Sequence, residues 1–131
     1  MNVFDYFFNE TKHLENDFVI GNKETISYKD LYINSLKVAS YINENIGEDK
    51  NIVLIGQNSV FFITVYLGIL KSGNVCVPLD FSVEKDNFIF INKLTESKII
   101  FYDEKIKTKL DLKDYVTKID EEQIIENQTV K

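Results

Sequence analysis

Few residues in this chain could do chemistry, and they lie far apart. His13 is the only histidine and stands in a polar stretch, so neither a histidine-based triad nor a multi-histidine metal site can form. We expect a solvated surface position for it. No serine lies in a G-x-S-x-G turn. Nucleophilic hydrolase chemistry therefore has no support in the sequence.

The stretch 68–75 (GILKSGNV) comes closest to a phosphate-binding loop. Gly68 and Gly73 have the spacing of the two glycines in G-x-x-x-x-G-K-[ST], but the lysine and hydroxyl that should follow are absent. A phosphate loop also runs from a strand into a helix, whereas this stretch leaves a helix and enters a strand. We therefore expect Gly73 to end a helix.

Acidic residues offer two other kinds of site. Asp103-Glu104 and Asp120-Glu121-Glu122 could hold Mg²⁺, but adjacent carboxylates in a helix point to different faces, so solvated charge is the expectation. Asp80 follows a predicted strand at its carboxyl end, where open α/β sheets bind ligands. A ligand role for Asp80 competes with the commoner role of capping the next turn.

The segments that position these residues alternate between strand and helix. Residues 51–56 (NIVLIG) are an apolar run of strand length, 58–71 are an apolar stretch of helix length, and 75–79 form a strand in which we expect Cys76 to be buried. The helix over 58–71 is apolar on all its faces, so it should be covered on every side. It is too short to span a membrane, which takes about 20 apolar residues.

The N-terminal third is predicted to open with a short amphipathic helix from about Val3 to Leu14. Runs 18–20 and 25–27 then form a hairpin around Gly21-Asn22-Lys23. Ser27 and Asp30 resemble a capping box for a long amphipathic helix, and Gly47 is placed to end it in a left-handed conformation.

Beyond the strand over 75–79, the sequence predicts a third long helix over 84–96 that carries Phe88, Ile91 and Leu94. A strand over 98–102 follows. From Asp103 onward the pattern weakens, and we expect a helix or loop over 104–114, a last strand over 115–119 and an acidic tail over 121–126.

This alternation predicts an α/β fold with a mainly parallel sheet and helices on both faces. The 131 residues suffice for one domain, and the 44% hydrophobic content excludes a disordered chain. All 15 basic residues are lysine and the net charge is -6, so the chain lacks the basic stripe that nucleic-acid binding requires. One cysteine and no signal segment favour the cytoplasm.

Two stretches at the right separation carry a family resemblance. They are 25–31 (TISYKDL) and 53–80, which runs from VLIGQNS through YLGILKSG to VPLD. Together they resemble the first two core motifs of the AMP-forming adenylating enzymes, the superfamily of acyl-CoA synthetases, peptide-synthetase adenylation domains and luciferases. The resemblance covers about residues 3–102 and is weaker over 103–131. It implies that residues 1–131 form a partial N-terminal subdomain of the AMP-forming ligase fold.

In that family a carboxylate attacks the α-phosphate of ATP to give an acyl-adenylate and pyrophosphate, and a thiol then takes the acyl group. The family's phosphate loop, its aromatic-Thr-Glu motif, its ribose-binding aspartate and its catalytic lysine have no match in this sequence. The resemblance therefore assigns no catalytic, cofactor-binding or metal-binding residue to this chain. It implies ATP and Mg²⁺ only for a full-length parent enzyme.

The resemblance also has departures. Many relatives place prolines after the Pro-Leu-Asp motif, whereas residues 81–85 (FSVEK) contain none. The sequence stops at Lys131, about where the family's phosphate loop should soon begin. We expect a fragment, a truncated gene product or a piece prepared for crystallisation, and such a piece should not be catalytically competent alone.

Three functional hypotheses remain open. Within the family, Gly56-Gln57-Asn58 and the stretches 77–80 and 100–102 look more like fatty-acyl ligases, and an amino-acid adenylation domain, including a D-alanine-activating one, is the alternative. A non-catalytic α/β interaction module is the hypothesis from another class. The expected partner is the remainder of the parent enzyme, with self-association through an exposed apolar face. An ordinary Rossmann domain fails on the absent G-x-G-x-x-G.

Overall fold

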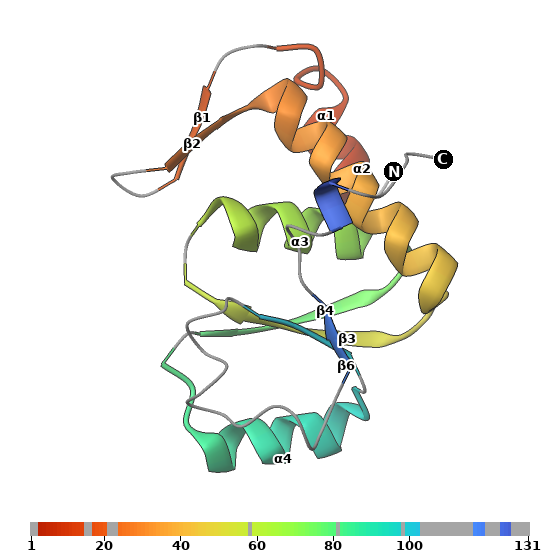
Figure 1. The fold of residues 1–131 in the computed structure, drawn as a ribbon, viewed down its shortest axis with the longest axis vertical. Helices are drawn as coiled ribbons and strands as arrows, with labels where there is room; N and C mark the ends of the chain where they lie inside the picture. The colour runs from red at the N-terminus through yellow and green to blue at the C-terminus, as the bar shows by residue number, and fades with distance from the viewer. Residues whose placement is uncertain are drawn as a thin grey trace.

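Helices and strands alternate along the chain (Figure 1). The computed structural model describes residues 3–14, 17–20, 24–57, 59–80, 82–97, 99–102, 117–119 and 124–126. The elements in chain order are α1 (Val3–Phe8), β1 (Asp17–Ile20), β2 (Glu24–Ser27), α2 (Tyr28–Asn45), β3 (Asn51–Gly56), α3 (Val60–Lys71), β4 (Val75–Asp80), α4 (Lys85–Thr95), β5 (Ile99–Tyr102) and β6 (Thr117–Ile119).

The main sheet has the strand order β4-β3-β5-β6, and every neighbouring pair is parallel. Central strand β3 pairs Val53 with Val77 on one side and with Ile100 on the other. In Figure 1, α1, α2 and α3 lie on one side of this sheet and α4 lies on the other. The predicted parallel sheet with helices on both faces is therefore confirmed.

The hairpin and the long helix that follows it form as predicted. Strands β1 and β2 pair antiparallel, although the turn residues 21–23 lie outside the described residues. Ser27 is the N-cap of α2, and its hydroxyl accepts a hydrogen bond of 3.0 Å from the Asp30 N–H. Gly47 ends the helix with φ +105° and donates its N–H to the Ile42 carbonyl. Local capping chemistry thus fixes both ends of α2.

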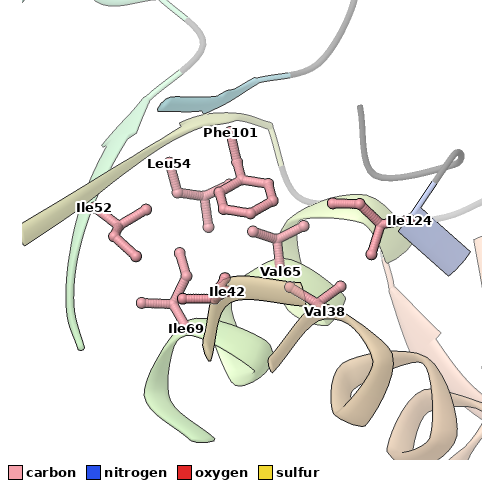
Figure 2. Packing of buried hydrophobic residues seen from close by; sticks show 8 residues of the cluster. All are labelled: Val38, Ile42, Ile52, Leu54, Val65, Ile69, Phe101 and Ile124. Carbon is pink, nitrogen blue, oxygen red and sulfur yellow. The ribbon is translucent and has the colours of Figure 1, made fainter. Parts of the chain in front are cut away.

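Alternation along β3 divides its side chains between two cores. Ile52 and Leu54 face α2 and α3, where they meet Phe101 of β5 and four residues of the helices (Figure 2). Val53 and Ile55 face α4, where they pack with Phe88. Because a strand alternates its side chains, a strand that is apolar at both sets of positions must be covered on both faces.

A third cluster attaches α1, and this helix is shorter than predicted. Phe4 and Phe8 are buried against Leu31 of α2 and Leu67 of α3. The helix ends at Phe8, and turns follow in which the N–H groups of both Thr11 and Lys12 bond to the Phe8 carbonyl. The polar residues 9–13 have no apolar face to bury, so tertiary packing does not extend the helix.

The expectation that β4 is a buried strand was wrong. β4 is an edge of the sheet, Val75 is 57% exposed and Cys76 is only half-buried. The sequence pattern of a continuous apolar run does not separate an edge strand from a central one. Pro78 is consistent with the edge position, because proline cannot donate to a sheet ladder.

The predicted third long helix is present as α4, and its three apolar residues differ in burial. Phe88 is fully buried, whereas Leu94 is 72% exposed and Ile91 is half-buried. Six helical positions rotate a side chain by about 600°, so Leu94 lies about 240° around the helix from Phe88. The two residues therefore cannot share one buried face.

The last strand predicted over 115–119 is present as β6, but the segment predicted as an acidic tail holds a buried residue. β6 pairs with β5 in parallel, and a helical turn at 124–126 buries Ile124 in the cluster between α2 and β3. The Lys37 ammonium donates a hydrogen bond of 3.1 Å to the Ile125 carbonyl. The predicted helix or loop over 104–114 lies outside the described residues. Within the described part of the chain, no helix is long and apolar enough to cross a membrane.

Candidate functional site

The chain path opens a crevice between β3 and β4 at their carboxyl ends. The chain leaves β3 towards α3 on one face of the sheet, and it leaves β4 towards α4 on the opposite face (Figure 1). Open α/β sheets bind their ligands at such a point, where neighbouring connections diverge. This position makes the crevice the strongest candidate site in the fold.

A hollow of about 400 Å³ occupies this crevice. Its lining comes from the ends of β3 and β4 and from the first turn of α3, and consists of Gly56, Gln57, Phe62, Pro78, Leu79 and Asp80. Gly56 and Asp80 are paired in the β3–β4 register, so the two strands end side by side. The sequence indicated Asp80 for this position but missed Gln57 and Phe62, although both follow the end of a predicted strand.

The wall formed by α3 is held by a cap and by close packing. Ser59 is the N-cap, and its hydroxyl accepts a hydrogen bond of 3.1 Å from the Phe62 N–H. The Val60 N–H donates to a carboxylate oxygen of Glu24, at 3.2 Å. A Cβ at Gly56 would come within 3.4 Å of the Phe62 ring. At that distance a Cβ would make an ordinary van der Waals contact, so the ring packs against the end of β3 without requiring glycine there.

Asp80 caps the turn that follows it, which is the commoner of the two roles that the sequence offered for this residue. Its carboxylate accepts hydrogen bonds from the N–H and from the hydroxyl of Ser82, and the Val83 N–H donates to its carbonyl at 3.0 Å. The same carboxylate also lies on the wall of the hollow. The turn thus fixes the position of the acidic group at the end of β4.

The chemistry of this lining is unsuited to a phosphate group. Asp80 supplies negative charge, no lysine among the described residues contributes to the wall, and two N–H groups of the first turn of α3 are already bonded. An anion would therefore meet repulsion from Asp80 without a cationic partner among the described lining residues. The described residues also include no group of three or more His, Cys, Asp or Glu side chains that could hold a metal ion.

The other residues that the sequence singled out do not join this crevice. His13 is exposed. Gly73 has φ +84° and donates its N–H to the Leu70 carbonyl, so it follows the end of α3, as predicted. The acidic groups at 103–104 and 120–122 lie outside the described residues.

Gly68 has a packing role that sequence reasoning missed. A Cβ at this position would lie 2.6 Å from Cγ1 of Val38 and 3.1 Å from the Ser35 carbonyl oxygen, which is closer than real Cβ contacts. The Val38 side chain of α2 therefore lies directly against the backbone of α3 at Gly68. The signal was a lone glycine inside an otherwise apolar helix.

A second hollow lies between α1, α2 and α3, and its charges are already paired. It measures about 340 Å³ and is lined in part by Lys12 and Lys71. The Lys71 ammonium lies 3.7 Å from the Asp5 carboxylate and 5.4 Å from the centre of the Phe4 ring. The Lys12 ammonium lies 5.8 Å from the centre of the Tyr32 ring. These contacts fit a packing role for both lysines.

Comparisons with known proteins agree with this geometry. Residues 8–131 match the family model described as AMP-binding enzyme. A D-alanine--D-alanyl carrier protein ligase from Listeria welshimeri is 32% identical over 91 residues, which cover 68% of this chain and 18% of the relative. The chain therefore spans about a fifth of the length of this curated relative.

Solved structures share the fold at low sequence identity. The nonribosomal peptide synthetase FmoA3 superposes with a TM-score of 0.88 at 14% identity, and the match covers 99% of this chain and 14% of that one. A benzoate CoA ligase from Burkholderia xenovorans gives a TM-score of 0.86 at 14% identity, covering 99% of this chain and 29% of that one. Both structures contain this arrangement of elements within a much longer chain.

Proposed function

Because this chain belongs to the AMP-binding enzyme family and corresponds to its N-terminal portion, we propose that it is part of an ATP-dependent, AMP-forming carboxylate ligase. The family match over residues 8–131 is the observation that carries this proposal. The parent enzyme would join a carboxylate oxygen to the α-phosphorus of ATP and release pyrophosphate, and a thiol would then displace AMP from the acyl group. ATP and Mg²⁺ would be bound by parts of the parent other than residues 1–131.

In this proposal the chain supplies structure rather than catalytic groups. The β3–α3–β4 unit buries its helix and aligns two strand ends, and the described residues that line the crevice include no cationic group for a triphosphate. Stabilisation of a charged transition state requires donors placed at the developing charge. We therefore propose that the 131-residue chain alone is inactive.

That inactivity can be measured directly. The purified chain, mixed with ATP, Mg²⁺ and a panel of carboxylic acids, should give no exchange of labelled pyrophosphate into ATP. The control is a full-length family member in the same assay. Clear exchange by the 131-residue chain would show that residues within it perform the adenylation.

We propose an amino acid as the acid that the parent activates. The support is the D-alanine--D-alanyl carrier protein ligase, which is 32% identical over 68% of this chain. The competing fatty-acyl proposal rests on the resemblance of Gly56-Gln57-Asn58 to that branch. The two structural matches above, a peptide synthetase and a CoA ligase, support the fold in both cases.

The acid can be identified with the full-length product of the gene. We expect ATP–pyrophosphate exchange with D-alanine or another amino acid and none with fatty acids. Exchange with fatty acids alone would replace the amino-acid proposal with the acyl-CoA synthetase one. Exchange with no acid in either panel, from a folded full-length protein, would contradict a carboxylate ligase.

We propose the cytoplasm as the compartment of this chain, since its single Cys76 can form no disulfide within residues 1–131.

A further inference from the structure

Helix α4 carries an apolar surface that no described element covers. Phe90 is 66% exposed and Leu94 is 72% exposed. They are four positions apart, so they are neighbours on one side of the helix. That side is opposite Phe88, which is fully buried against β3 and β5. We call Phe90 and Leu94 the outer face of α4.

The other long helices of the fold show how unusual this face is. None of the residues from Val60 to Leu70 of α3 is exposed, and the exposed residues of α2 are all polar. A single exposed apolar side chain is common on protein surfaces, but two large ones in adjacent helical turns are characteristic of a contact surface. α4 thus has the two-sided apolar character of a helix that lies between two layers.

The free edge of β4 is a second surface on which another segment could pack, but Pro78 disfavours the pairing of a strand there. The Val75 N–H donates to the Lys50 carbonyl at 2.9 Å, on the β3 side of the strand. Because N–H directions alternate along a strand, Pro78 faces the free edge, where it offers no donor. A proline in this position blunts a sheet edge against pairing with another strand.

The length of related chains indicates what covers the outer face of α4. The benzoate CoA ligase contains this fold as 29% of its chain, and the D-alanine--D-alanyl carrier protein ligase matches over 18% of its length. In each of them most of the polypeptide lies outside the matched part. A contact surface on a partial subdomain is therefore expected to meet the remainder of the same chain.

We propose that the outer face of α4 is the surface on which a later segment of the parent polypeptide packs, while β4 stays a free edge of the sheet. This proposal rests on the proposed function, because it needs a longer parent. The segment is apolar where it meets Phe90 and Leu94. Asp86 and Lys93, both exposed on α4, lie at the rim and favour a partner surface with charges of both signs.

Thiol labelling can test this surface, because Cys76 is a poor competitor for the reagent. Burial raises the pKa of the Cys76 thiol to about 12, so a cysteine introduced on the surface should react first. Leu94→Cys would be labelled with a neutral maleimide in the 131-residue chain and in the full-length product of the gene. Peptide mapping by mass spectrometry would then report the rate at position 94.

We expect labelling at position 94 to be about tenfold slower or more in the full-length protein than in the 131-residue chain, since a buried site reacts only when it opens. Lys85→Cys is the matched control, because Lys85 is exposed on α4 and lies about 180° around the helix from Leu94, so it should lose much less reactivity. The same full-length variant in denaturant should label fully. Phe90→Cys provides a second variant if Leu94→Cys fails to fold.

Three outcomes would contradict the proposals in different ways. Equal rates at position 94 in both proteins would overturn the docking surface while leaving the ligase proposal intact. Protection that appears in the 131-residue chain alone as its concentration rises would identify a second copy as the occupant and overturn the assignment to the same polypeptide. A gene that ends at Lys131 would overturn the proposed function itself.

Discussion

The helices on the two faces of the sheet bury their apolar residues to different extents. On one face, the exposed residues of α2 and α3 are all polar, and α3 is packed between α2 and the sheet. On the other face, α4 buries Phe88 and exposes Phe90 and Leu94. The outer surfaces of α2 and α3 therefore need no further cover, whereas α4 has an apolar surface still to be covered.

The largest expected effect compares the two sides of α4. Phe88→Ala should lower the free energy of unfolding by about 3–5 kcal/mol, because it removes a fully buried ring from the cluster with Val53 and Ile55. Phe90→Ala on the outer face should change it by less than about 0.5 kcal/mol. Urea denaturation of both variants measures this difference. Similar losses for the two substitutions would mean that Phe90 already has a partner within this chain.

The next effect tests how tightly the completed face is closed. Gly68→Ala places a methyl group 2.6 Å from Cγ1 of Val38, and overpacking of this kind typically costs about 1–3 kcal/mol. Val38→Gly in the same chain removes both Val38 atoms that would clash and should recover part of that loss, so a double-mutant cycle from thermal or urea unfolding gives a favourable coupling between the two positions. Additive losses would contradict the direct contact of α2 and α3.

A matched pair of asparagines compares polar groups on the two sides. Asn74 is buried, and its side chain bonds to the Lys50 N–H, the Gly47 carbonyl and the Ser72 hydroxyl at 2.8–2.9 Å. Asn74→Ala should cost about 1–3 kcal/mol, since it leaves these groups unpaired.

On α4, the side-chain oxygen of Asn92 is buried without a hydrogen-bond partner among the described residues. Asn92→Leu should therefore be neutral or stabilising in urea unfolding. A loss comparable with that of Asn74→Ala would show that Asn92 has a polar partner.

The smallest effect concerns alkaline pH on the completed face. Cys76 packs against the cluster between the sheet and α3, and burial raises the pKa of its thiol to about 12. The folded state therefore resists the thiolate that the unfolded state forms from about pH 9 upward, so stability is retained below that pH and falls between about pH 9 and 12. Cys76→Ala should flatten this part of the pH profile of unfolding. An unchanged profile would contradict the burial of the thiol.

The sequence predicted elements best where local chemistry fixes them. Ser27 and Gly47 mark the two ends of α2 as expected, because caps act within one helical turn. The edge position of β4 and the exposure of Leu94 were not predicted, since both depend on which strands and helices lie alongside. Ile124 was missed for the same reason: its burial requires contact with residues far along the chain.

The candidate site was predicted only in part. Asp80 could be located at a strand end from the pattern of apolar runs, and its capping of the next turn followed from residue type. Gln57 and Phe62 join it only because β3 and β4 are adjacent and end in register. Sequence spacing alone does not show which strands are neighbours in the sheet.

The central position of β3 has a consequence for the order of folding. Its partner in β5 lies about twice as far along the chain as its partner in β4. Doubling the length of a loop raises the entropic cost of closing it by only about 0.6 kcal/mol. Pairings between distant segments nevertheless form late, because the loop must close before their contacts can stabilise the structure. We expect β3, α3 and β4 to assemble as an early unit, with β5 and β6 added afterwards. When the ribosome has released only the residues up to β4, the nascent chain would thus already contain the unit to which the rest of the sheet is added.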